Sequence, residues 1–150
     1  MSVVSGPVGT VQGAGAIGRS IVFMGVSGCG KSSLAAAVSA ALKLPLVEGD
    51  DFHGDVNRSK MTRGIALTDA DRRQWLDALA DVLRAGPDGV VLTCSALKRA
   101  YRERLRAASS GLRFVFMDLP QSEAQRRVEA RAPGHFFPPD LVASQFATLE

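Results

Sequence analysis

Short apolar runs alternate with longer helical patterns along most of this chain. The apolar runs cover Ile21–Val26, Leu44–Glu48, Val90–Cys94 and Arg113–Leu119. The helical patterns begin after Lys31 and then cover Asp69–Ala85, Lys98–Ala108, Ser122–Arg131 and Leu141–Leu149. Because parallel strands are buried on both faces, this alternation predicts an α/β fold with a parallel sheet covered by helices on each side.

The carboxyl ends of the predicted strands are where such a sheet binds its ligands. The segments to examine are therefore Gly25–Ser32, Asp50–Lys60, Ser95–Arg102 and the residues beyond Asp118. The apolar strand that ends at Asp118 also resembles a Walker B strand, which makes this carboxylate an alternative ligand for Mg²⁺.

Two glycine-rich motifs flank the first apolar run. GAGAIG at Gly13–Gly18 has the spacing of a dinucleotide-binding turn, and GVSGCGKS at Gly25–Ser32 has the spacing of a P-loop. A dinucleotide-binding turn leaves a strand and opens a helix, whereas GAGAIG precedes a strand. The second motif leaves a strand and opens an alanine-rich helical pattern. We therefore interpret it as a P-loop and residues 1–18 as a flexible leader.

The residue types of the P-loop suit phosphate binding. Its glycines let backbone N–H groups turn toward phosphate oxygens, and the positive end of the following helix adds to the attraction. Lys31 is expected to reach the terminal phosphates, and the Ser32 hydroxyl is expected to hold Mg²⁺. The predicted ATP-binding residues are Gly25, Val26, Ser27, Gly28, Cys29, Gly30, Lys31, Ser32 and Ser33.

Two carboxylates follow the second predicted strand. Asp50 or Asp51 can accept a proton from a substrate hydroxyl that attacks phosphorus, or both can lie in a solvated turn. His53 and Lys60 come soon after them, and their spacing alone fits a surface position as well as a site.

The helix predicted over Asp69–Ala85 carries a more informative cation. Arg72 continues the apolar stripe that begins at Leu76, so its guanidinium needs an anion. A substrate carboxylate is one partner, through a two-pronged pair, and a buried structural salt bridge is the other.

Two further cation pairs have the four-residue spacing of a helix face. Lys98 and Arg102 follow the third predicted strand, where they reach into the cleft or form a solvated face. Arg127 and Arg131 precede a segment rich in proline, glycine and phenylalanine, a position that suits a lid closing over ATP.

Composition narrows the classes of function. A chain of 150 residues with a net charge of +3 favours one domain without a basic stripe, and one Trp and one Tyr offer little stacking for nucleic acid. We find no run of membrane length and no signal peptide, and the two cysteines suit a reduced setting. We therefore expect a cytoplasmic protein that binds neither nucleic acid nor membrane.

The motifs read together resemble the gluconokinase family. The resemblance rests on GVSGCGKSS, GDDFHGDVNRSKM, LTDADRRQWL, CSALKRAYRERLR and GHFFPPDLVASQFATLE, in order. It implies an α/β/α P-loop fold of the nucleoside-monophosphate-kinase type with a small lid, over residues 19–150. It also implies a homodimer that phosphorylates D-gluconate at its 6-hydroxyl with ATP and Mg²⁺.

The resemblance also assigns roles to residues. It makes Lys31, Asp50, Arg127 and Arg131 catalytic and Ser32 the metal ligand. The substrate-binding residues that it implies are Asp50, His53, Lys60, Arg72, Ser95, Lys98 and Arg102.

Relatives in this family continue past the last helical pattern into one more strand and helix. The resemblance therefore implies that the predicted strand Arg113–Leu119 has an open edge here, and that this chain binds ATP weakly and aggregates. A shikimate or adenylylsulfate kinase and a nucleotide-binding protein without catalysis remain the alternatives.

Overall fold

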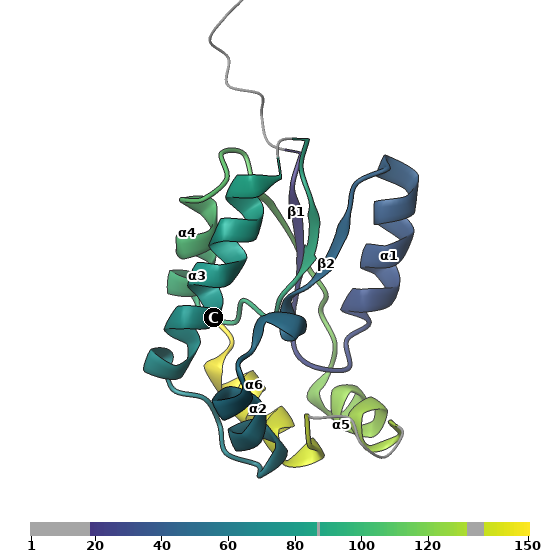
Figure 1. Cartoon of the computed structure of the whole chain (residues 1–150). Helices are drawn as coiled ribbons and strands as arrows, with labels where there is room; N and C mark the ends of the chain where they lie inside the picture. Colours follow the sequence, from purple (N-terminus) through teal and green to yellow (C-terminus); the bar gives the residue numbers. More distant parts are fainter. Residues whose placement is uncertain (1–18, 87, 132–136) are drawn as a thin grey trace, which may run out of the picture.

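A computed structural model describes residues 19–86, 88–131 and 137–150 (Figure 1). The predicted leader, with its GAGAIG motif, and residues 132–136 of the predicted lid lie outside this range. Among the described residues, no helix combines the length and the apolar character needed to cross a membrane.

A parallel sheet of four strands forms the centre of the fold. The strands are β1 (Ile21–Met24), β2 (Leu46–Glu48), β3 (Val91–Thr93) and β4 (Arg113–Phe116). Their order is β2-β3-β1-β4, and each neighbouring pair is parallel. Ile21 of β1 lies opposite Val91 on one side and Arg113 on the other. The predicted parallel sheet is confirmed.

Helices cover both faces of this sheet. They are α1 (Lys31–Leu42), α2 (Asp55–Thr62), α3 (Asp69–Ala85), α4 (Arg99–Arg106), α5 (Gln121–Glu129) and α6 (Val142–Thr148), with short 3₁₀ helices η1 (Gly49–Phe52) and η2 (Pro139–Leu141). In Figure 1, α3 and α4 lie on one face and α1 lies on the other, while α2, α5 and α6 gather beyond the carboxyl ends of the strands. The three-layer α/β/α arrangement is therefore as predicted.

The two central strands, β1 and β3, bury side chains on both faces, as their apolar runs predict. Val22 packs with Leu79 and Leu92 beneath α3 and α4. The next residue, Phe23, packs with Ala35 beneath α1. Successive side chains of a strand point to opposite faces, so an uninterrupted apolar run is what a sheet between two helical layers requires.

Helix α3 has the bounds that its pattern predicts. The Thr68 hydroxyl accepts a hydrogen bond from the backbone N–H of Asp71 at 3.2 Å, and the Asp71 carboxylate accepts from the N–H of Thr68 at 2.9 Å. This reciprocal cap satisfies two backbone donors that the helix leaves open. The buried stripe of α3, which includes Leu76, Leu79 and Leu83, then holds it against the sheet.

The strands are shorter than their apolar runs. β1 ends at Met24 because Gly25 has a φ of +141°, a conformation in which the backbone leaves the sheet. β4 ends at Phe116 and lies at one edge of the sheet, where Val115 and Phe116 are exposed. The outer position predicted for this strand agrees with the observed strand order.

Candidate active site

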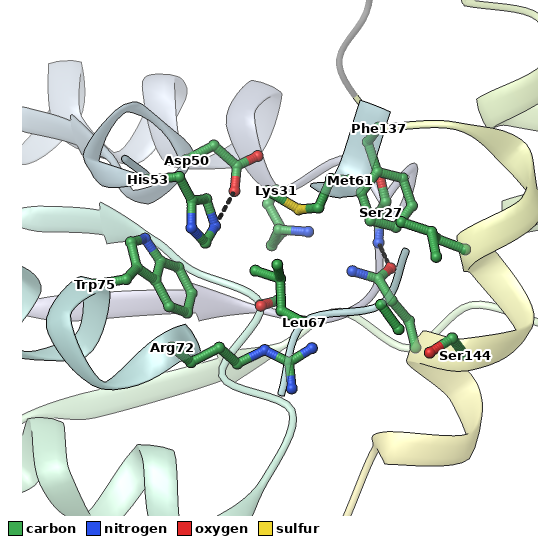
Figure 2. A pocket seen from close by; sticks show the side chains of 14 residues that line it. Ser27, Lys31, Asp50, His53, Met61, Leu67, Arg72, Trp75, Phe137 and Ser144 are labelled. Atoms are coloured by element: carbon green, nitrogen blue, oxygen red, sulfur yellow. Dashed lines mark hydrogen bonds and ion pairs between the residues drawn. The ribbon is translucent and has the colours of Figure 1, made fainter. Parts of the chain in front are cut away.

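Two adjoining cavities open at the carboxyl ends of the strands. The first, here called the phosphate cavity, is lined by Ser27, Gly28, Gly30, Lys31, Ser32, Ser33, Glu48, Asp50, Thr93, Cys94, Arg127 and Arg131. The second, here called the acceptor pocket, is lined by Ser27, Lys31, Asp50, His53, Met61, Ala66, Leu67, Arg72, Trp75, Ser95, Phe137, Leu141, Ser144 and Gln145 (Figure 2). Ser27, Lys31 and Asp50 belong to both linings.

The P-loop is held in its curved form by glycine and by its contact with α5. Gly28 has a φ of +82°, and a Cβ at this position would lie 3.1 Å from the Val128 side chain and 3.2 Å from the Ala124 carbonyl. A larger residue would therefore strain the backbone and push α5 away. The loop leads directly into α1 at Lys31, so the positive end of this helix faces the phosphate cavity.

The Lys31 ammonium group lies in the mouth of this loop. It donates hydrogen bonds to the carbonyls of Gly25 at 3.0 Å and Val26 at 2.9 Å. Lys31 lines both cavities, so its ammonium group lies between the acceptor pocket and the place where a P-loop binds phosphates.

A carboxylate that the sequence reasoning missed faces the P-loop. Glu48 Oε2 accepts hydrogen bonds from the Ser32 hydroxyl at 3.1 Å and from the Thr93 hydroxyl. Mg²⁺ prefers oxygen ligands and takes few of them from the protein, so the pair of Ser32 and Glu48 fits this ion. The signal was available, because Glu48 is the last residue of a predicted strand and its carboxylate stands at the ligand-binding edge.

Arg127 of α5 and Arg131, which follows this helix, line the phosphate cavity, and their catalytic role stays a prediction. Arg131 donates to the Ser27 hydroxyl at 2.9 Å, and Arg127 donates to the Gly28 carbonyl at 3.3 Å and to Glu123 at 3.0 Å. Both cations therefore lie beside the loop that would cradle the phosphates.

Asp50 and Asp51 occupy different environments. Both side chains are exposed, but Asp50 lines both cavities and Asp51 lines neither. The turn η1 that carries both residues thus places the first carboxylate at the site, and the choice of Asp50 as the base stays a prediction.

His53 forms one wall of the acceptor pocket together with Trp75. The two rings stack with centroids 4.3 Å apart and planes 14° from parallel, and the imidazole side chain is only 6% exposed. Burial, helped by the charges of Arg58 and Arg72, lowers the pKa of His53 to about 4. The ring is therefore neutral near pH 7, with Nε2 3.9 Å from Oδ1 of Asp50 (Figure 2).

Arg72 reaches the pocket from the first turn of α3. Its guanidinium donates to the Tyr101 hydroxyl at 2.9 Å, and that hydroxyl donates to the Asp69 carboxylate. Among the described residues, no carboxylate lies within ion-pair distance of Arg72. The buried salt bridge considered from the sequence is thus replaced by a neutral phenol, and the charge stays available to an anion in the pocket.

Two lysines that were predicted to contact the substrate, Lys60 and Lys98, form ion pairs with carboxylates of the protein. Lys60 pairs with Asp71 at 2.8 Å, and this hydrogen bond is the main reason why the pKa of Asp71 falls to about 2. Lys98 pairs with Asp69 at 2.9 Å. These two lysines line neither cavity, so their contact with substrate stays a prediction.

Arg102 is likewise directed at the protein. It donates to the carbonyls of Ala96 at 2.8 Å, Leu97 at 3.1 Å and Glu150 at 2.9 Å, and it lines neither cavity. Ser95, by contrast, borders the acceptor pocket as predicted.

The C-terminal helix contributes residues to which sequence reasoning gave no role. Gln145 of α6 accepts a hydrogen bond from the backbone N–H of Ser27 at 2.6 Å, so α6 is tied to the P-loop. Gln145 and Ser144 both line the acceptor pocket, and Figure 2 shows Ser144 across the pocket from Trp75 of α3. Nothing in the spacing of these residues predicts that α6 returns to the P-loop.

A phosphate-binding loop that shares a lysine and a carboxylate with a second, partly apolar pocket defines a P-loop kinase for a small molecule. The family profile described as an AAA domain matches residues 21–149. The gluconokinase of Gluconobacter oxydans is 46% identical over 136 residues, which cover 88% of this chain and 75% of that protein. This chain belongs to the gluconokinase family.

Solved structures agree with this assignment. A gluconokinase from Sinorhizobium meliloti 1021 superposes with a TM-score of 0.79 at 47% identity, covering 89% of this chain and 75% of that one. The APS kinase of Mycobacterium tuberculosis, solved in complex with AMPPNP and APS, has a TM-score of 0.59 at 28% identity, covering 75% of this chain and 69% of that one. The predicted P-loop kinase fold is confirmed, and the adenylylsulfate alternative is the more distant match.

Proposed function

We propose that this kinase transfers the γ-phosphoryl group of ATP to the 6-hydroxyl of D-gluconate. The observation that carries the proposal is that Lys31 and Asp50 line both the phosphate cavity and the acceptor pocket. A phosphoryl donor on the P-loop and an acceptor in the second pocket would meet between these two side chains.

Each end of the acceptor pocket suits one end of the proposed substrate. Arg72 offers two parallel N–H donors to a carboxylate, and its only hydrogen bond to a side chain among the described residues goes to the Tyr101 hydroxyl. Asp50 lies at the junction of the cavities, where it accepts the proton of the hydroxyl that attacks phosphorus. Gluconate has a carboxylate at one end and a primary hydroxyl at the other.

The phosphate cavity supplies the positive charge that this transfer requires. Lys31 would exchange its bonds to the loop carbonyls for phosphate oxygens, and Arg127 and Arg131 line the same cavity. Mg²⁺ would be held by Ser32 with Glu48 close by, and it neutralises charge on the phosphates when bound.

A coupled assay for ADP release tests the proposal. We expect release to depend on D-gluconate, with 6-phosphogluconate identified by ³¹P NMR, and to be weak with shikimate or adenylylsulfate. Turnover of either alternative acceptor in place of gluconate would overturn the proposed substrate. Binding of ATP with no turnover of any acceptor would instead favour a nucleotide-binding protein without catalysis.

The homodimer and the cytoplasmic location belong to the same proposal. They follow from the family and not from contacts within this chain. Analytical ultracentrifugation measures the first of these properties.

A further inference from the structure

The turn that carries Asp50 and His53 is held at its first residue, Gly49. The N–H of Gly49 donates to the Thr93 hydroxyl at 3.3 Å, and its carbonyl accepts from the Trp75 indole N–H at 2.8 Å. A Cβ on Gly49 would lie 2.2 Å from the Thr93 carbonyl oxygen, so the backbone of η1 is pressed against the end of β3. The position of Asp50 is therefore set by contacts on both sides of the residue before it.

Trp75 makes a second contact with the same turn. Its ring stacks on His53, and its own side chain is buried in the core beneath α3. Arg58 also holds the turn, by donating hydrogen bonds to the carbonyls of Asp50 at 2.8 Å and His53 at 3.3 Å. Arg58 belongs to α2, however, and not to α3. Within the described part of the chain, Trp75 supplies the hydrogen bond that joins this turn to α3.

Helix α3 also carries Arg72, three residues before Trp75. Figure 2 shows both side chains on the pocket side of this helix, with Trp75 beside His53 and Asp50, and Arg72 farther from that carboxylate. One rigid helix therefore bears the cation at one end of the pocket and the indole that anchors the carboxylate turn at the other.

We infer that Trp75 is a positioning residue that sets the spacing between the carboxylate-binding end and the phosphate-accepting end of the pocket, and thereby selects sugar acids by chain length. The inference rests on the proposed function, in which Arg72 binds the carboxylate and Asp50 receives the hydroxyl proton. Transfer requires the hydroxyl oxygen within near-attack distance of phosphorus, so an acid one carbon too short is bound out of reach.

Trp75→Phe is the sharpest test, because it keeps an aromatic ring for the stack on His53 and removes the indole N–H that Gly49 requires. We expect kcat/KM for D-gluconate relative to the five-carbon D-xylonate to fall by about tenfold or more, with KM for ATP little changed. Leu83→Val is the matched control, because Leu83 is buried on the same helix and lines neither cavity. This control should lose stability and keep its selectivity.

The outcomes separate the inference from the proposed function. A folded Trp75→Phe enzyme with selectivity and kcat within twofold of wild type would overturn the inference alone, as would an equal loss of selectivity in Leu83→Val. Wild-type protein that does not phosphorylate gluconate would overturn the proposed function and the inference with it.

A measurement on the wild-type protein covers the case in which the variant does not fold. Trp75 is the single tryptophan of the chain, so its fluorescence reports on this wall of the pocket alone. We expect D-gluconate to change the emission saturably and D-sorbitol, which lacks the carboxylate, to have little effect. Unchanged emission at gluconate concentrations that saturate turnover would contradict a contact between the Trp75 wall and the substrate.

Discussion

The phosphate cavity and the acceptor pocket are built in different ways. Half of the residues that line the first come from one contiguous segment, Ser27–Ser33, which includes the start of α1. Besides Ser27 and Lys31, the second takes its lining from segments spread over the chain, among them η1, α2, α3, η2 and α6. A local motif thus supplies half of the phosphate cavity, whereas the acceptor pocket depends on how separate elements pack.

This difference predicts which substitutions should impair the use of ATP and which should impair the use of the sugar acid. Changes in the P-loop should affect every acceptor equally, because the γ-phosphoryl group is common to all of them. Changes on α3 should affect the sugar acid and leave the nucleotide nearly untouched. A change at Asp50, which lines both cavities, should reduce the rate of phosphoryl transfer more than the affinity for either substrate.

The largest effect is expected at Lys31. Lys31→Ala removes the cation at the junction of the cavities, so we expect gluconate phosphorylation to be lost. The melting temperature without ATP should stay the same, because the side chain is only part-buried. Water in the open cavity can bond the two loop carbonyls that Lys31 leaves. Lys43→Asn, at the other end of α1, is the control and should keep full turnover. Near-normal turnover by the Lys31 variant would exclude the P-loop role.

Asp50→Asn should come next, with kcat reduced roughly 10²–10⁴-fold because the amide cannot accept the hydroxyl proton. The affinity for gluconate should change far less, which a fluorescence titration can measure. The neighbouring Asp51→Asn lies outside both cavities and should behave as wild type. An inactive Asp51 variant beside an active Asp50 variant would reverse the assignment.

Arg72→Lys should affect the acceptor side alone. It keeps the charge but loses the planar pair of donors, so we expect KM for gluconate to rise by about tenfold or more and KM for ATP to stay within a few fold. Arg73→Lys, on the exposed side of α3, serves as the matched control. Equal damage to both KM values, together with a lower melting temperature, would point to a structural role for Arg72.

The smallest effect is expected from His53, whose protonation should make the free energy of unfolding depend on pH. Burial lowers its pKa to about 4 in the folded protein, below the value of about 6.5 expected for the unfolded chain. The unfolded state therefore binds the proton first, and the free energy of unfolding should fall as the pH drops from about 6.5 to 4.

Urea denaturation of wild type and His53→Gln over this pH range isolates the histidine. The difference in free energy of unfolding between the two proteins should change with pH in this window and be constant above pH 7. The paired carboxylate of Asp71, whose pKa is lowered from 3.8 to about 2, contributes to both proteins, so its effect cancels in the difference. A constant difference throughout would show that His53 is not buried as a neutral ring.

Much of the fold could be predicted because its signals are local. The apolar runs identified all of the observed strands, and the cap at Thr68 together with the leucine stripe marked both ends of α3. The P-loop was recognisable because its chemistry lies in the backbone of consecutive residues, where glycine spacing is sufficient. Strand ends were less well predicted, because apolar character continues past the residue at which pairing stops.

The acceptor pocket could be predicted only in part. Arg72 was visible as a cation on an apolar stripe, yet the sequence did not show that its partner is the phenol of Tyr101 and not a carboxylate. Lys60 was expected at the substrate, but Asp71 lies close enough to pair with it. Which of several charged groups meet depends on the packing of elements that are distant in sequence.

The sequence by itself therefore determined the order of strands and helices along the chain, the P-loop and the family. The tertiary structure decided which carboxylate of the pair at Asp50 faces the cavities, that Glu48 lies beside Ser32, and that Trp75 joins η1 to α3. The physical reason is the range of the interactions: turns, caps and periodic burial act over a few residues, whereas a pocket is formed by side chains that only long-range packing brings together.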